Sequence, residues 1–219
     1  MFRIFFICFK ILIMNNETSR DASFYTQSKN WGWYNSPRQL EKMLQYCKNT
    51  GKLKILEIGA FDGVSANIIL DLMCPHPDSQ VHTIDPYLPD ATTPEVSAAT
   101  QAQFEENYQK GGHAESIFLY NGISAEVLAW MAATEGFWES YDLAYIDGSH
   151  RCADVFIDAA LCWHLMKPGS IIVFDDYNWK PHLPTACRPK AAIDSFQLCF
   201  EGLIELLWED VQIGFRKLC

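Results

Sequence analysis

Short apolar runs alternate with helix-like segments through the middle of the chain. The runs lie at residues 54–59, 81–85, 116–120, 142–147 and 170–176. Runs of four to seven apolar residues that alternate with helices are typical of βαβ units, in which both faces of a parallel sheet are covered. The pattern therefore predicts five parallel strands joined by helices.

The two ends of the chain depart from this alternation. Residues 36–47 begin with Ser-Pro, an N-cap and first-turn pair, and predict a helix. Residues 167–169 read as a turn. After a predicted helix at 189–202, two runs at 203–208 and 211–218 are so close that they form an antiparallel hairpin. The predicted fold class is α/β: a doubly wound (Rossmann-like), seven-stranded, mostly parallel sheet with a C-terminal antiparallel hairpin.

The first fourteen residues, MFRIFFICFKILIM, are apolar but shorter than the roughly 20 residues that span a bilayer. Lys10 interrupts them, so we expect no stable membrane span. They are a leader or surface anchor, an element packed on the domain, or an extension before a true start at Met14. We favour the last, because a polar stretch follows. Residues 15–50 then form an N-terminal lid or helical segment, and 51–219 form the main domain.

Composition limits the class of function. The chain has 219 residues, 49% hydrophobic and 20% charged, as a globular protein does. Its net charge of −10 would repel a phosphate backbone, which argues against a nucleic-acid partner. The eight cysteines show no C-x-x-C spacing, so we expect free, mostly buried thiols and a cytoplasmic location.

Residues just after each strand are the candidates for ligand binding, because doubly wound sheets bind ligands at the carboxyl ends of their strands. Gly59 and Gly63 allow a tight turn close to a ligand, and Ser65 opens a helix whose N-terminus favours negative charge. Asp85 ends the second strand, where an acid can accept both hydroxyls of a ribose. Together they indicate an adenosine cofactor; taken singly, a plain turn and a solvated carboxylate are the alternatives.

Three acids and a histidine end the fourth and fifth strands. If these strands are neighbours, Asp147, Asp175 and Asp176 converge and repel one another unless a cation or proton compensates. Mg²⁺ or another divalent cation is suited to such carboxylates. Asp175 and Asp176 can both reach one ion only if the strand ends before them. His150 is placed to take a proton near neutral pH.

Three segments resemble the class I S-adenosylmethionine-dependent methyltransferases, and most of all their small O-methyltransferases. They read LEIGAFDGVSA at 56–66, YIDGSH at 145–150 and LMKPGSIIVFDDY at 165–177, and the resemblance covers roughly residues 50–218. It implies a seven-stranded sheet whose last strand is antiparallel. It also implies that Glu57, Gly59 and Gly63 form a cofactor motif, that Asp85 holds the cofactor ribose, and that Ser124 lies near the adenine.

The resemblance also bears on the acids. In metal-dependent relatives, residues that match Asp147, Asp175 and Asp176 bind Mg²⁺, and the residue at the position of His150 is a lysine in catechol-type enzymes. We therefore expect S-adenosylmethionine-dependent O-methylation of a hydroxyl on a sugar or small metabolite. A divalent metal assists it, Asp147 and His150 take part in catalysis, and His150 is the base.

Other functions stay open on the sequence. A module that binds the adenosine cofactor without catalysis, a metal-independent methyltransferase and a nicotinamide-dependent oxidoreductase are the alternatives, although the Gly-x-x-x-Gly spacing argues against the last. Aromatic residues suited to stack on an acceptor, or to serve as core or lid, are Tyr177, Trp179, Trp31 and Trp33. The oligomeric state is open, with a homodimer among the alternatives.

Overall fold

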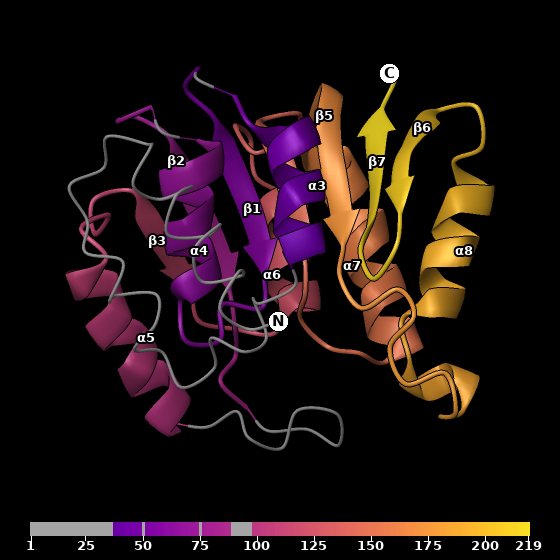
Figure 1. Ribbon diagram of the computed structural model, residues 1–219, viewed down its shortest axis with the longest axis horizontal. Coiled ribbons are helices and arrows are strands. Elements are labelled where there is room, and N and C mark those ends of the chain that lie inside the picture. The colour runs from indigo at the N-terminus through magenta and orange to yellow at the C-terminus, as the bar shows by residue number, and fades with distance from the viewer. Residues whose placement is uncertain (1–36, 50, 75, 89–97) are drawn as a thin grey trace.

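A computed structural model of the chain describes residues 37–49, 51–74, 76–88 and 98–219. Its centre is one sheet of seven strands in the order β3-β2-β1-β4-β5-β7-β6 (Figure 1). All neighbouring strands from β3 to β5 pair in parallel, whereas β7 is antiparallel to both of its neighbours. The predicted fold class and the terminal hairpin are confirmed.

The strands follow the apolar runs closely. Their bounds are β1 Lys54–Ile58, β2 Gln80–Ile84, β3 Ile117–Tyr120, β4 Tyr141–Ile146, β5 Met166–Phe174, β6 Ile204–Glu209 and β7 Ile213–Lys217. The central strands are buried almost throughout, as expected for a sheet that is covered on both faces.

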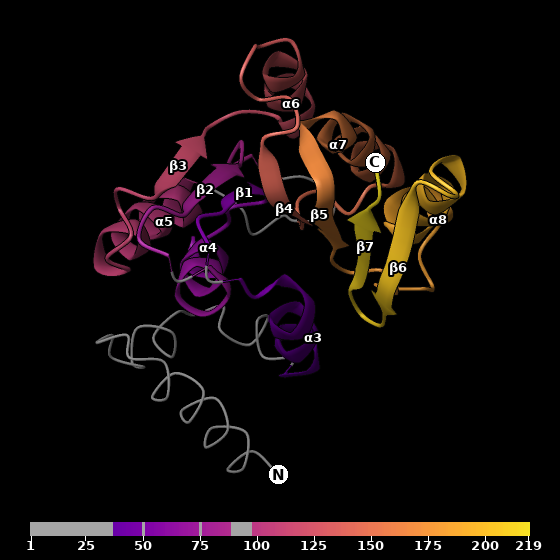
Figure 2. The ribbon, with the colours of Figure 1, turned by 90° about the horizontal axis from the view of Figure 1, so that it is seen from above.

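Helices cover the two faces of the sheet in two groups (Figure 2). One group is α3 Pro37–Cys47, α4 Val64–Ile68, the π-helix η1 Ile69–Met73, and α5 Ala98–Lys110. The other is α6 Ser124–Ala132, α7 Cys152–Leu165 and α8 Lys190–Cys199, preceded by the short η2 Thr185–Cys187. Each group encloses its own hydrophobic core, one on each side of the sheet.

The turn predicted at residues 167–169 lies inside a strand. Tyr141 pairs with Met166 and Leu143 pairs with Ile171, so four residues of β5 lie opposite one residue of β4. The extra residues form a bulge, which Gly169 accommodates with a φ of 83°. The Pro-Gly pair therefore bends β5 instead of ending it.

Two further expectations differ from the structure. The helix expected to open at Ser65 is α4 followed by η1, and buried Asp71 of η1 lies 2.7 Å from Nε2 of His113. The described cysteines are free, but only Cys47, Cys74 and Cys162 are buried. Cys199 and Cys219 are exposed, and Cys152 and Cys187 are partly exposed, so the expectation of mostly buried thiols is wrong.

The predictions for residues 1–14 and for residues 15–36, including Trp31 and Trp33, lie outside the described residues. Within the described ranges, no helix combines the length and the apolar character needed to cross a membrane. The cytoplasmic location and the homodimer stay predictions.

Candidate active site

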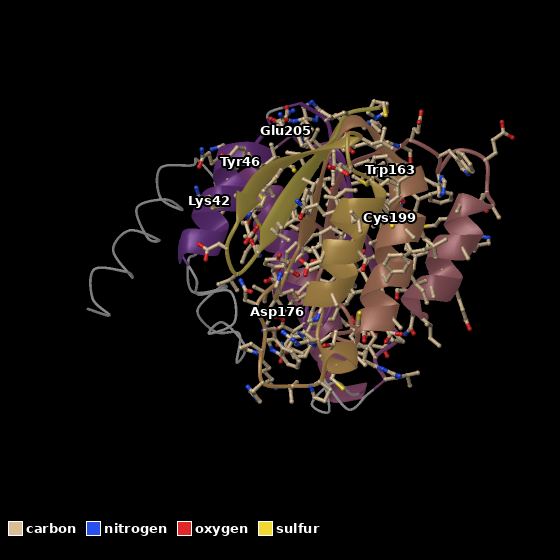
Figure 3. The ribbon with its side chains drawn as sticks, turned by 90° about the vertical axis from the view of Figure 1, so that its right-hand side faces the viewer. Lys42, Tyr46, Trp163, Asp176, Cys199 and Glu205 are labelled. Atoms are coloured by element: carbon tan, nitrogen blue, oxygen red, sulfur yellow. The ribbon has the colours of Figure 1, made fainter. Side chains whose placement is uncertain are left out.

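The carboxyl ends of β1, β2, β4 and β5 lie at one edge of the sheet, where the acids singled out in the sequence gather. In Figure 3, Asp176 lies at this edge, far along the sheet from Glu205 near the start of β6. Neighbouring strands place Glu57 beside Thr83 and Tyr145, and Ile146 beside Phe174. Residues more than a hundred positions apart in the chain therefore share this edge.

The turn after β1 depends on two glycines. Gly59 has a φ of 94°, and a Cβ there would lie 2.2 Å from the carbonyl oxygen of Asp147. Gly63 has a φ of 75°, and a Cβ there would lie 2.7 Å from the ring of Phe104. Both conformations favour glycine. In this structure the space is filled by the chain itself, so Gly59 allows the β1 turn to pack directly on the end of β4.

Glu57 is fully buried beneath this turn, and the hydroxyl of Ser65 donates a hydrogen bond to its Oε1. Burial, with a smaller contribution from the charges of Asp85 and Asp62, raises the pKa of Glu57 to about 7, although hydrogen bonds from Ser65 and Thr83 act in the opposite direction. The edge therefore carries more negative charge than its hydrogen bonds compensate, and a cationic ligand would be favoured here.

Asp85 is held by the backbone at the end of β2. Its carboxylate accepts the N–H of Phe61 at 3.0 Å and the N–H of Tyr87 at 2.7 Å, and burial raises its pKa nonetheless. Phe61 and Tyr87 both have left-handed backbones, with φ of 43° and 50°. Strained backbone of this kind is often found at functional sites, where it aims a group at a ligand.

Ser124 begins α6, and its hydroxyl hydrogen-bonds buried Asp158 of α7. Burial raises the pKa of Asp158 to about 7. The structure thus places Ser124 at the contact between α6 and α7, and its closeness to an adenine stays a prediction.

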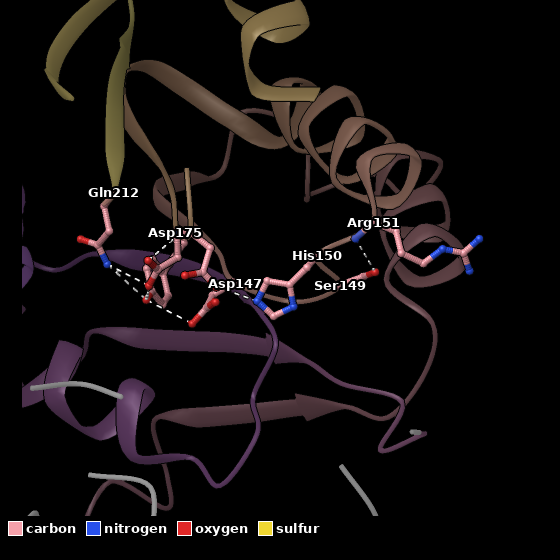
Figure 4. Close-up of polar contacts among 8 residues, drawn as sticks. Asp147, Ser149, His150, Arg151, Asp175 and Gln212 are labelled. Atoms are coloured by element: carbon pink, nitrogen blue, oxygen red, sulfur yellow. Dashed lines mark hydrogen bonds and ion pairs between the residues drawn. The ribbon is translucent and has the colours of Figure 1, made fainter. Parts of the chain in front are cut away.

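Asp147, His150 and Asp176 form the closest group of ligand atoms at this edge. One atom from each lies within 4.8 Å of the others. Nε2 of His150 lies 2.6 Å from Oδ2 of Asp176. Figure 4 shows the imidazole of His150 facing Asp147 and Asp175. Strand β5 ends at Phe174, and Asp176 has a φ of 57°. The chain has therefore left the strand before Asp175 and Asp176, which meets the condition for both carboxylates to face one side.

The acid cluster (Asp147, Asp175 and Asp176) is electrostatically strained. Burial raises the pKa of Asp147 well above its ordinary range, and the charges of Asp175 and Asp176 raise it further. Burial and the charge of Asp176 also raise the pKa of Asp175. Because the ionisation of one half-buried acid opposes that of its neighbour, a proton or a cation between Asp147 and Asp175 is favoured.

Asp175 is engaged by residues that sequence reasoning missed. The hydroxyl of Tyr145 donates to its Oδ2 and also lies 3.2 Å from Oδ2 of Asp147, and Nε2 of Gln212 lies 3.0 Å from Oδ2 of Asp175. Tyr145 precedes Asp147 by two residues, and residues two apart along a strand face the same side. The spacing in the sequence could therefore have predicted that Tyr145 lies beside Asp147. Gln212 lies in the β6–β7 connection, where the sequence carries no such signal.

An aromatic ring covers His150. Trp179 stacks on the imidazole, with the ring centroids 4.2 Å apart and the planes 14° from parallel, and Nζ of Lys180 lies 4.1 Å from the indole. Nδ1 of His150 is buried and has no hydrogen-bond partner among the described residues. Tyr177, by contrast, is buried with its hydroxyl bonded to Asp194, so it is a core residue and not an acceptor platform.

A small pocket opens over this group. It is bounded by the ends of β4 and β5 and the start of α7, and by Ile146, Asp147, Gly148, Ser149, His150, Val155, Asp175, Asp176 and Pro189. Four of these lining residues are carboxylates or the histidine. The pocket therefore offers the acids and the base described above to a molecule that enters it.

The sequence and the fold both match known proteins. Residues 56–177, more than half of the chain, match the family model of a methyltransferase domain. No curated protein matches the chain.

Solved structures share its fold. An O-methyltransferase from Bacillus cereus in complex with SAH superposes with a TM-score of 0.63 at 14% identity, over 97% of this chain and 90% of that one. The O-methyltransferase TomG from Streptomyces achromogenes, in complex with SAM, gives 0.60 at 14% identity over 95% of both chains. The MycE methyltransferase of mycinamycin biosynthesis, in complex with Mg and SAH, gives 0.56 at 18% identity over 90% of this chain and 53% of that one.

Proposed function

This chain belongs to the methyltransferase-domain family and is a class I S-adenosylmethionine-dependent methyltransferase, and from that premise we propose that it methylates a hydroxyl oxygen on a sugar or other small metabolite. The observation that carries the proposal is the convergence of Asp147, His150 and Asp176 beside the turn that follows β1. A carboxylate pair and an imidazole at one point are suited to bind and deprotonate a hydroxyl group. O-methyltransferases of the same fold support the choice of oxygen as acceptor.

The residues present fit S-adenosylmethionine. Its sulfonium and ammonium groups are cations. The buried acids Glu57, Asp62 and Asp85 lie close enough to repel one another, so a cation bound beside them would be attracted. Oδ1 and Oδ2 of Asp85 accept the backbone N–H groups of Tyr87 and Phe61, and the carboxylate keeps capacity for a ribose hydroxyl. Glu57 and Asp85 would thus hold the cofactor, with the turn of Gly59 and Gly63 between them.

The acid cluster fits a divalent cation such as Mg²⁺ or Mn²⁺. Asp147 and Asp176 would hold it, because hard cations prefer carboxylate oxygens and keep several waters. We do not assign His150 as a ligand: a metal-bound histidine nearly always donates its other ring N–H to an acceptor, and Nδ1 of His150 has no such partner among the described residues. The ligand role of Asp175 stays a prediction.

The chemistry then divides between the bound groups and the chain. The cofactor, when bound, would supply the methyl group, and a cation held by Asp147 and Asp176 would lower the pKa of the acceptor hydroxyl. Nε2 of His150 donates its hydrogen to Oδ2 of Asp176, so Nδ1, which has no partner among the described residues, is the ring nitrogen that would accept the proton of that hydroxyl. The stacked ring of Trp179 holds the imidazole in place and excludes water from one face. Fixed positions of this kind lower the barrier by holding the reacting groups together.

Calorimetric titration of S-adenosylmethionine into the purified chain tests the proposal, with and without Mg²⁺. We expect micromolar binding that Asp85→Ala abolishes, because that change removes the carboxylate at the end of β2. Asp78→Ala removes an exposed acid just before β2 and serves as the matched control. Failure of the unaltered chain to bind would overturn the proposal.

Acceptor screening completes the test. With the cofactor bound, hydroxylated sugars and small polyhydroxylated metabolites are offered, and methylated product is measured with and without a chelator. Product that forms only with metal supports metal-assisted transfer, whereas equal yields would indicate a metal-independent methyltransferase. Cofactor binding without any product would support the non-catalytic binding module instead.

A further inference from the structure

Two neutral residues, Tyr145 and Gln212, stand between the acid cluster and the C-terminal hairpin. Both are buried, with exposed fractions of 5% and 3%. Nε2 of Gln212 lies 3.3 Å from the hydroxyl of Tyr145, and both groups donate to Oδ2 of Asp175. Figure 4 shows Gln212 reaching from the hairpin toward Asp175, on the side away from His150.

These contacts occupy much of the hydrogen-bond-accepting capacity of the Asp175 carboxylate. Its Oδ2 accepts Tyr145 and Gln212, and its Oδ1 accepts the backbone N–H of Asp176 at 2.7 Å. A metal ligand needs a lone pair directed at the ion, and three protein donors already occupy lone pairs of the Asp175 carboxylate. In keeping with this, the close group of ligand atoms contains Asp147, His150 and Asp176 and omits Asp175.

The same hydroxyl also reaches the neighbouring acid. Tyr145 lies two residues before Asp147 on one face of β4, and its hydroxyl is 3.2 Å from Oδ2 of Asp147. One phenol therefore contacts both acids and sets the distance between them. Without it, the two half-buried carboxylates would repel each other with no donor between them.

The backbone fixes the position of Gln212. The N–H of Asp210 donates to the carbonyl oxygen of Gln212 at 2.8 Å, which closes the β6–β7 connection. The N–H of Tyr177 donates to the carbonyl oxygen of Val211 at 2.8 Å, which ties that connection to the loop after β5. The backbone at Gln212 is thus held by the β6–β7 connection itself and by the loop after β5.

We propose that Tyr145 and Gln212 are positioning residues, which hold Asp175 outside the ligand set of a divalent cation and direct Asp147 toward it. The inference rests on the proposed function, since it concerns the metal of that same site. Residues that orient metal ligands from behind commonly change metal affinity by about 10–100-fold when they are replaced. Asp175 then contributes its charge to the site without a direct bond to the ion.

Titration of Mn²⁺ alone, followed by calorimetry, tests the inference on the full chain. Tyr145→Phe and Gln212→Leu should each weaken Mn²⁺ binding by about 10–100-fold. Tyr141→Phe is the matched control: it removes another buried hydroxyl of β4, bonded to His82 at 3.0 Å, at the other end of the strand. The control should bind Mn²⁺ as the unaltered chain does. Melting temperatures and S-adenosylmethionine affinity, which we expect to change little, separate positioning from general destabilisation.

The acids themselves give the second comparison. Asp176→Asn should abolish Mn²⁺ binding, whereas Asp175→Asn should weaken it only to the extent of Tyr145→Phe. Equal loss in the two acid variants, unchanged binding in Tyr145→Phe, or no Mn²⁺ binding by the unaltered chain would each overturn the inference. Failure of the proposed function is separate, because the unaltered chain would then not bind S-adenosylmethionine.

Discussion

Replacing Glu57 by glutamine should stabilise the folded chain and weaken its binding of S-adenosylmethionine. Glu57 is fully buried, and its pKa is about 7, compared with an ordinary value of 4.5. Above neutral pH, the folded chain must therefore hold a buried negative charge. Glutamine has nearly the same shape, carries no charge, and can keep a hydrogen bond with Ser65.

The size of the effect follows from the change in pKa. Each unit corresponds to about 1.4 kcal/mol, so a rise from 4.5 to about 7 lowers stability by about 3 kcal/mol at alkaline pH. Below pH 4.5 the folded and unfolded chains both hold the proton and the effect vanishes. Between 4.5 and 7 only the unfolded chain releases it, so stability falls as pH rises.

Urea unfolding at pH 8 and at pH 5 measures this difference. At pH 8, Glu57→Gln should raise the free energy of unfolding by about 3 kcal/mol, or the melting temperature by about 6–12 °C for a chain of this size. At pH 5 the gain should be under about 1 kcal/mol. Glu115→Gln removes an exposed acid and should change neither value.

Although Glu57→Gln should stabilise the fold, it should weaken the binding of S-adenosylmethionine. The neutral amide no longer attracts the cationic cofactor, so calorimetry at pH 8 should show weaker S-adenosylmethionine binding in the same variant. A variant equally stable at both pH values would refute the argument from buried charge. A variant that is more stable but binds the cofactor as before would refute the assignment of Glu57 to the cofactor site.

Three further outcomes follow from the geometry. Gly59→Ala should destabilise the chain by about 2–4 kcal/mol in chemical unfolding, because its Cβ would strike the carbonyl oxygen of Asp147 from a left-handed backbone. Burial and Lys54 lower the pKa of His82 to about 4, so stability should fall as pH drops from about 6.5 to about 4, and His82→Gln should flatten that profile. His150→Ala should lower turnover by about 100-fold or more with cofactor affinity unchanged. If the variant and the unaltered chain had equal turnover, His150 would not be the base.

Much of the fold was predictable because local signals agreed with one another. The five apolar runs, the glycines after β1 and the short connection at residues 209–210 all point to one topology, and the sheet has it. The bulge at residues 167–169 was not predictable, because Pro-Gly is a turn signal whenever its neighbours are unknown. Pairing of β5 with β4 and β7 keeps the chain in the sheet there.

The site was predictable only as far as strand ends reveal it. Asp85, Asp147, Asp175 and Asp176 follow strands, so the rule for ligand binding in doubly wound sheets selects them. The rule does not say which oxygen of each acid is already hydrogen-bonded. That depends on Gln212, which a hairpin brings to Asp175 from 37 residues away.

The edge of the sheet that carries these acids also contains features that lower the stability of the fold. Phe61, Tyr87 and Asp176 have left-handed backbones there, and each such residue costs about 1–3 kcal/mol. Glu57 and Asp147 add buried charge at the same edge. The two hydrophobic cores on the faces of the sheet offset these costs. Stabilising changes at this edge should therefore reduce ligand binding, whereas stabilising changes in either core should leave it intact.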